Sequence, residues 1–213
     1  MNNEELQTIA QRVGTNHGYE EITAEFSPAR DFKVKWQRSY RWINMEVPDY
    51  LQHAPEAVME SLINSIFEKI RGDEGGYARE VTDYLQSAEF LSDNQPVYVN
   101  RIRISPDNRL NASYARLVSK GLLPSDDRVV FGTSPWKCGL KAVQGSLLMK
   151  TVVINTALLD MDDEEALDFA IYSAVRFIEQ EFPAHNTSVE SLATTYPGFR
   201  AIQNRIEEAG LRI

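Results

Sequence analysis

The spacing of hydrophobic residues along this chain changes abruptly near residue 55. Apolar and polar residues alternate in FKVKWQ, which begins at Phe32, and again in WINMEV, which begins at Trp42. Such alternation is typical of a strand with one buried face. From Pro55 onward the apolar residues recur every three to four positions, the spacing of an amphipathic helix, and Gly72 follows as a stop signal. The pattern therefore predicts strands followed directly by a helix.

The rest of the chain contains more segments of both kinds. We expect strands in EITAEFS, DRVVFG and KTVVINTALL, and helices near residues 3–14, 107–120 and 162–182. No repeat of fixed period is apparent. This order of elements predicts an α+β fold, with a small, mostly antiparallel sheet packed against helices.

Charge limits the classes of partner. The formal net charge is −9, which argues against unspecific nucleic-acid binding, because such binding needs positive charge to displace counterions from phosphates. Basic residues nevertheless gather in two short runs. They are Arg30, Lys33, Lys35, Arg38 and Arg41, and then Arg101, Arg103 and Arg109. We interpret both runs as solvated faces of strands and loops, and an anionic partner stays open.

The cysteine content and the hydropathy of the chain indicate its cellular compartment. Cys138 is the single cysteine, so no intrachain disulfide framework is expected, and a reducing compartment suits the chain. The first residues carry acids where a signal peptide needs positive charge. No apolar stretch approaches the roughly 18 residues of a membrane span. We expect a cytoplasmic protein with no membrane partner.

Acidic residues cluster before the helix expected at 162–182. We interpret the run from Asp160 to Glu165 as a helix start rather than a metal cluster. Asp162 followed by Glu165 is a plausible capping pair, because carboxylates near a helix N-terminus accept from free amides and favour the positive end of the dipole. Pro183 is expected to end this helix.

The order of motifs in the last third of the chain is that of a known family. The matching pieces are Val153-Ile154-Asn155, Leu158-Leu159, the acidic turn, Leu167 to Tyr172, His185, Leu192 and Tyr196-Pro197-Gly198. This order resembles the minimal zinc metallopeptidase (zincin) module of SprT-like, YgjP-like and minigluzincin proteins. FKVKWQRSYRWINMEV and the helix after it are similar to the opening hairpin and first helix of that module.

The resemblance implies one zincin-like domain over residues 1–213. Its core would consist of 32–72 and 128–199. The N-terminal extension 1–31 and the helical insertion 73–127 would be elaborations of that core.

Zincin chemistry needs two histidines one helical turn apart, a glutamate beside the first, and a third ligand further along. In this chain the resemblance places Ser173, Ala174 and Phe177 at the His, Glu and His positions of the HExxH motif, and His185 at the third ligand. Serine is a poor zinc ligand, alanine transfers no proton, and phenylalanine has no lone pair to donate. We therefore expect neither a zinc cofactor nor peptidase activity.

The expected function is a catalytically inactive metallopeptidase-like protein that binds a peptide or protein, with no nucleic-acid partner. Candidate cleft residues are Cys138, Gly139, Asn155 and Tyr172. Lys137 and Lys141 would favour a Cys138 thiolate. The sequence fixes no general base beside Cys138, however, so we do not expect a nucleophile there.

Three alternatives stay open. In the first, the helix at 162–182 is an ordinary core helix that never carried a metal site. In the second, the chain is a divergent metal-dependent hydrolase that uses His185 with unidentified ligands. In the third, the chain is a structural or assembly protein whose working surface is the N-terminal segment and residues 73–127.

Overall fold

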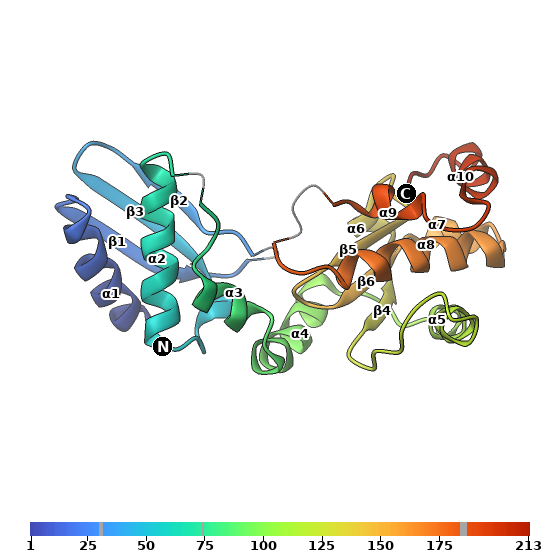
Figure 1. The fold of residues 1–213 in the computed structure, drawn as a ribbon, viewed down its shortest axis with the longest axis horizontal. Coiled ribbons are helices and arrows are strands. Elements are labelled where there is room, and N and C mark those ends of the chain that lie inside the picture. The colour runs from blue at the N-terminus through green and yellow to red at the C-terminus, as the bar shows by residue number, and fades with distance from the viewer. Residues whose placement is uncertain (30–31, 74, 184–186) are drawn as a thin grey trace. The chain divides into compact units, whose positions relative to one another are not determined.

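The computed structural model describes residues 1–29, 32–73, 75–183 and 187–213. The chain forms two compact units, Met1–Asn94 and Gln95–Ile213, each with its own three-stranded sheet (Figure 1). The α+β class expected from the sequence is confirmed. The two stretches expected to form one core, residues 32–72 and 128–199, lie in different units. The first stretch belongs to the first unit and the second stretch to the second, and the two share no sheet.

The first unit is built around one mixed sheet. Its elements are α1 (Asn3–Asn16), β1 (Glu21–Ser27), β2 (Lys35–Arg38), β3 (Trp42–Pro48), the 3₁₀ turn η1 (Asp49–Leu51), α2 (Glu56–Ile70) and α3 (Arg79–Leu85). The strand order is β1-β3-β2, and β3 pairs parallel with β1 and antiparallel with β2. The expectation of a mostly antiparallel sheet is thus wrong. Residues 1–31 are not an extension of the unit, since they supply α1 and β1.

Helices α1 and α2 cover one face of this sheet, where they lie side by side (Figure 1). Ile43 and Met45 of β3 are buried on that face, and so are Leu62 and Ile63 of α2. The opposite face carries mostly polar side chains, as the alternation of β1 and β3 predicts, together with the exposed ring of Trp42. There Thr23 Oγ1 donates to Asn44 Oδ1 at 3.0 Å.

The second unit has the same strand order. Its elements are the end of α4 (Ala88–Ile102), α5 (Asn108–Ser119), β4 (Val130–Thr133), α6 (Pro135–Cys138), β5 (Val143–Ser146), β6 (Thr151–Ile154), α7 (Thr156–Asp160), α8 (Glu164–Ile178), α9 (Val189–Ala193) and α10 (Phe199–Glu208). The order is β4-β6-β5, with β6 parallel to β4 and antiparallel to β5. In both units the third strand lies at the centre.

The central strand β6 is buried on both faces. Val152 and Ile154 belong to the cluster that contains the apolar residues of α8. Val153 packs instead with Ile102 of α4 and Cys138 of α6. Because helices cover both faces, this strand is continuously apolar rather than alternating.

The helix expected at 162–182 is α8, and its N-cap differs from the predicted one. Asp163 caps the helix, since its Oδ1 accepts from the amides of Glu165 at 3.1 Å and Ala166 at 3.0 Å. Asp162 lies one residue earlier with φ at +51°. Among the described helices, none combines the length and apolar character that crossing a bilayer requires.

Candidate functional site

The helix positions that resemble the HExxH motif carry no ligand set for zinc. Ser173 is 0% exposed, and its hydroxyl donates to the Phe169 carbonyl at 2.7 Å. Ala174 is also fully buried. Neither the methyl of Ala174 nor the ring of Phe177 offers a lone pair, so these residues do not fit the donor set that zinc requires.

Phe177 lies against the edge strand β5, and Gly145 makes this close approach possible. A Cβ on Gly145 would lie 3.1 Å from Phe177 Cδ1 and 3.4 Å from the Ala174 carbonyl oxygen. Because Gly145 has no side chain, α8 packs directly on the strand. The Phe177 ring thus covers the strand where the resemblance places the second histidine.

His185, the candidate third ligand, lies outside the described residues. Within the described part of the chain, no cluster of three or more His, Cys, Asp or Glu side chains is arranged to hold a metal ion.

A groove of about 330 Å³ runs beside β5. Apolar and polar side chains line it: Lys141, Val143, Gln144, Gly145, Phe177, Thr187, Ser188, Val189, Glu190 and Ile213. Of Ser173, Ala174 and Phe177, the one that lines this groove is Phe177. The groove therefore combines a strand edge with an apolar surface from α8, α9 and the last residue.

The backbone of β5 turns alternate hydrogen-bonding groups away from β6. The Asn155 amide donates to the Ala142 carbonyl at 2.9 Å, and Val143 lies opposite Ile154. In an antiparallel pair the inward and outward groups alternate. Gln144 therefore bonds to β6, whereas the N–H and C=O groups of Val143 and Gly145 point away from it, along the free edge.

The last residues of the chain pair with residues 140–142, just before β5, and not with the outward groups of Val143 and Gly145. The Arg212 amide donates to the Leu140 carbonyl at 2.9 Å, the Ala142 amide donates to the Arg212 carbonyl, and Lys141 and Arg212 form a parallel bridge. Leu211 and Ile213 are buried in the core on either side. The sequence analysis did not predict this contact, although the apolar residues Leu211 and Ile213 on either side of Arg212 give the alternating pattern of a short strand.

The four candidate cleft residues lie outside the groove lining. Cys138 is buried on the other face of the sheet, its thiol donates to the Val153 carbonyl at 3.4 Å, and burial raises its pKa to about 11. Tyr172 bonds to Thr195 through the two hydroxyls at 2.9 Å. Asn155 Nδ2 donates to the carbonyls of Gly139 at 2.9 Å and Lys141 at 3.1 Å. Asn155 and Gly139 thus shape the turn that leads into β5.

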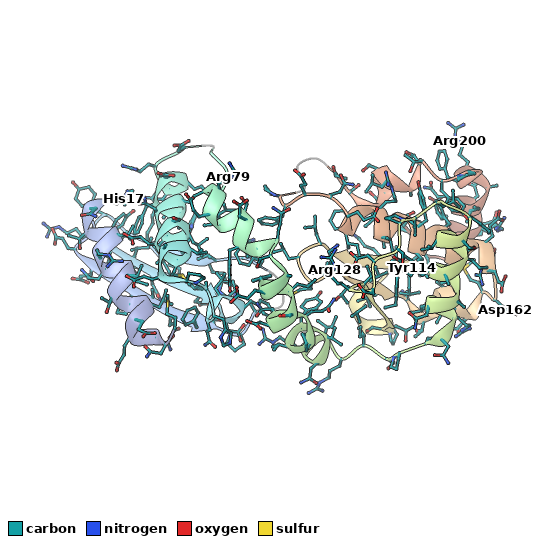
Figure 2. The ribbon with its side chains drawn as sticks, turned by 60° about the horizontal axis from the view of Figure 1, so that its bottom comes forward. His17, Arg79, Tyr114, Arg128, Asp162 and Arg200 are labelled. Atoms are coloured by element: carbon teal, nitrogen blue, oxygen red, sulfur yellow. The ribbon has the colours of Figure 1, made fainter. Side chains whose placement is uncertain are left out.

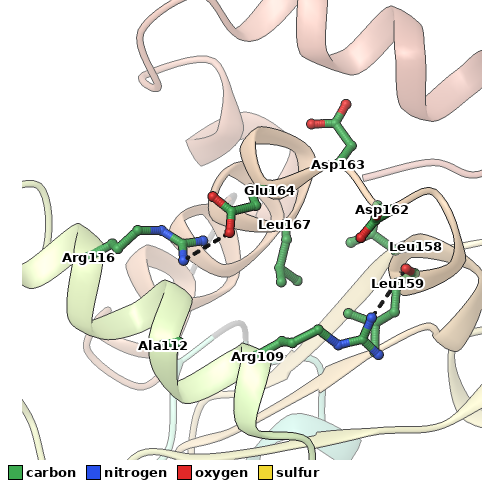
Figure 3. A pocket seen from close by; sticks show the side chains of 9 residues that line it. All are labelled: Arg109, Ala112, Arg116, Leu158, Leu159, Asp162, Asp163, Glu164 and Leu167. Carbon is green, nitrogen blue, oxygen red and sulfur yellow. Dashed lines mark hydrogen bonds and ion pairs between the residues drawn. The ribbon is translucent and has the colours of Figure 1, made fainter.

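A second, smaller cavity of about 130 Å³ lies between α5 and the start of α8 (Figure 3). Its two arginines are already paired with acidic side chains. Arg109 Nη2 lies 2.8 Å from Asp107 Oδ2, and Arg116 Nη1 lies 3.7 Å from Glu164 Oε1. We therefore assign this cavity a structural role.

A polar cluster fixes the loop after α5. Tyr114, labelled in Figure 2, donates through its hydroxyl to the Pro124 carbonyl at 2.9 Å and accepts from the Asp126 amide at 2.8 Å. The Asp126 carboxylate in turn pairs with Arg128 and Lys150, each at 2.8 Å. These bonds tie the loop to the residue before β6.

A comparison with protein-family models and a comparison with curated proteins gave no match to this chain.

Proposed function

We propose that the second unit is a non-catalytic peptide-binding module. An extended segment of another polypeptide would add to the free edge of β5 and lie in the groove beside it. The outward backbone groups of Val143 and Gly145 carry this proposal, since strand addition uses such groups for affinity and neighbouring pockets for side-chain selection.

The lining of the groove supports it. Phe177, Val189 and Ile213 give the groove an apolar surface. Alternate side chains of a bound segment point to this surface, and the segment should therefore carry apolar residues at every second position.

A zincin-like ancestry of this unit is part of the same proposal. It rests on the order of motifs in the sequence and on the contact between α8 and the edge strand at Phe177. Ser173, Ala174 and Phe177 would then be replacements that removed the catalysis. A single buried cysteine supports the cytoplasm as the place where the protein works.

Binding to a library of extended peptides tests the function, with two variants at one position. Val143→Pro removes the outward N–H, and proline is compatible with an edge strand where that group faces solvent. Val143→Ala removes comparable packing but keeps the N–H. We expect Val143→Pro to weaken peptide binding by at least about tenfold relative to Val143→Ala. Equal affinities of two folded variants would contradict strand addition.

Metal content and hydrolysis test the alternative enzyme. We expect far less than one zinc per chain in protein purified without chelator, and no cleavage of the same peptides. Near-stoichiometric zinc, together with cleavage that His185→Ala abolishes, would instead establish the divergent hydrolase.

A further inference from the structure

The two units share more than their strand order. In the first unit, Arg12 of α1 pairs with Glu56 at 2.9 Å and Glu60 at 3.0 Å, both on α2. In the second unit, Arg116 of α5 makes the corresponding pairs with α8. Its Nη1 lies 3.7 Å from Glu164, and its Nη2 lies 2.7 Å from Asp168.

The paired acids stand at the same places in two helices of equal length. Helices α2 and α8 both have 15 residues, and each begins with one of the paired glutamates. Ser65 and Ser173 also share one position along these helices. Both are buried, and each hydroxyl donates to the carbonyl four residues earlier, at 2.9 Å and 2.7 Å. Topology and residues together identify two copies of one helix–three-strand–helix unit.

In the first copy, β2 takes the place of β5. We propose that the free edge of β2 is a second binding surface, and that it takes an acidic, extended polypeptide segment. This proposal rests on the geometry of the first unit and not on peptide binding at β5.

The backbone of β2 presents an edge of the same kind. The Ser39 amide donates to the Trp42 carbonyl at 2.9 Å, and Arg38 lies opposite Ile43. Alternation therefore turns the N–H and C=O groups of Trp36 and Arg38 outward, away from β3. All four residues of β2 are exposed, so an incoming strand meets no covering element among the described residues of this unit.

The side chains around this edge select for negative charge. The segment FKVKWQRSYR, residues 32–41, carries Lys33, Lys35, Arg38 and Arg41 and no acid, although the chain as a whole has a net charge of −9. Lys35 lies 3.4 Å from Glu46, and Arg41 lies 3.2 Å from Glu20. Exposed pairs of this kind are weak and leave much of the positive potential available to a partner.

Exposed aromatic rings add contact area beside these charges. Trp36 is 45% exposed and Tyr40 is 93% exposed. Tryptophan, tyrosine and arginine are the residues that most often dominate binding energy at interfaces. An acid opposite Lys35, with an apolar residue opposite Trp36, would give favourable cross-strand pairs and requires an alternating segment.

Charge also indicates which kind of molecule would bind to the edge of β2. A second copy pairing through its own β2 would bring basic side chains together, which is unfavourable across strands. Glu21, Glu25 and Glu46 stand on the open face of the sheet, so the positive charge is confined to the edge, where an added strand would lie, and does not continue over a surface that a phosphate backbone could follow. An acidic polypeptide is therefore the occupant that this edge favours.

The two copies differ where the helix meets the edge strand. Gly145 lies opposite Val152, and Trp36 lies opposite Met45, so each faces the helix side of its sheet. Lys69 holds the position on α2 that Phe177 holds on α8, and its Nζ lies 3.6 Å from the centre of the Tyr77 ring. A lysine in place of a phenylalanine makes the first copy the one suited to an acidic segment.

Titration with defined peptides tests the proposal on the full chain. The probe is an alternating Glu-Tyr peptide of about ten residues, compared with a Lys-Tyr peptide of the same length. We expect the acidic peptide to bind at least about tenfold more tightly, and we expect Arg38→Pro to lose that binding while Arg38→Lys keeps it. Equal binding of both peptides, or full binding by a folded Arg38→Pro variant, would overturn the proposal.

Two controls separate this edge from β5 and from nucleic acid. Val143→Pro should leave binding of the Glu-Tyr peptide unchanged, so a failure at β5 does not imply a failure at β2. An oligothymidylate that binds and displaces the acidic peptide would also overturn the proposal, because it would make the basic segment a nucleic-acid surface.

Discussion

Arg116 joins α5 to α8 through Asp168, with 2.7 Å between Nη2 and Oδ1. The Asp168 side chain is 6% exposed, and Ser113 Oγ donates to the same carboxylate at 2.6 Å. In the first unit the corresponding pair, Arg12 and Glu60, is about half exposed on both sides. One contact thus occurs in two environments within a single chain.

This difference predicts unequal costs of removing the acid. Asp168→Ala should lower the free energy of unfolding by about 2–3 kcal/mol, because it leaves the Ser113 hydroxyl and part of the Arg116 guanidinium without their partner. Glu60→Ala should change it by no more than about 0.5 kcal/mol, since the pair is solvated. Urea unfolding of both variants measures the two values. Equal losses would show that burial does not set the strength of this contact.

Asp126 should make the stability of the second unit depend on pH. The hydrogen bond from Arg128, with further help from Lys150, holds the pKa of Asp126 well below its ordinary value. In the unfolded chain this carboxyl titrates near its ordinary pKa of about 3.9, so the unfolded state binds more protons over the range between the two values. The stabilisation is complete above that range and declines as the pH falls through it.

Asp126→Asn should therefore reduce the loss of stability on acidification from about pH 6 to about pH 3. The free energy of unfolding, measured at several pH values for both proteins, checks this. Asp73→Asn is a suitable control, because Asp73 is exposed. A pH profile that Asp126→Asn leaves unchanged would contradict the assignment.

The elements with strong periodicity could be predicted from the sequence. The helix after Pro55 is α2, and the strand EITAEFS is β1. Hydrophobic spacing determines these elements locally, because it reports which face is buried. Spacing carries no information on which strands pair or in which direction. For that reason the sequence did not reveal the parallel pairing of β1 with β3, or the division into two sheets.

The similarity of the two units could not be predicted from the sequence for a related reason. Loops of different length separate the matching elements in the two units, so no fixed period exists. The features that match, such as Ser65 with Ser173, become visible only when the helices are compared by position. The groove was missed in the same way, because Ile213 joins Val143 and Phe177 in its lining only in the folded chain. Of Ser173, Ala174 and Phe177, the one that could have indicated it is Phe177.

Gly145 should tolerate substitution poorly. A Cβ at this position would lie 3.0 Å from Ile178 Cγ2 and 3.1 Å from Phe177 Cδ1, closer than ordinary van der Waals contact. Gly145→Ala should lower the free energy of unfolding by about 1–2 kcal/mol, because α8 has to move off the strand. Gly76→Ala is a matched control, since a Cβ there would meet nothing within 4 Å. Thermal unfolding of both variants compares them, and equal midpoints would contradict the close packing of α8 on β5.

Cys138 should be unreactive in the folded protein. Its thiol is buried beneath β6, and burial raises its pKa to about 11, so very little thiolate exists near neutral pH. Because the thiolate is the attacking species, reaction with Ellman's reagent at about pH 8 should be at least about 100-fold slower in the folded protein than in urea. The absorbance of the released thiolate measures both rates. Rapid modification of the folded chain would show that the thiol is accessible and would restore it as a candidate nucleophile.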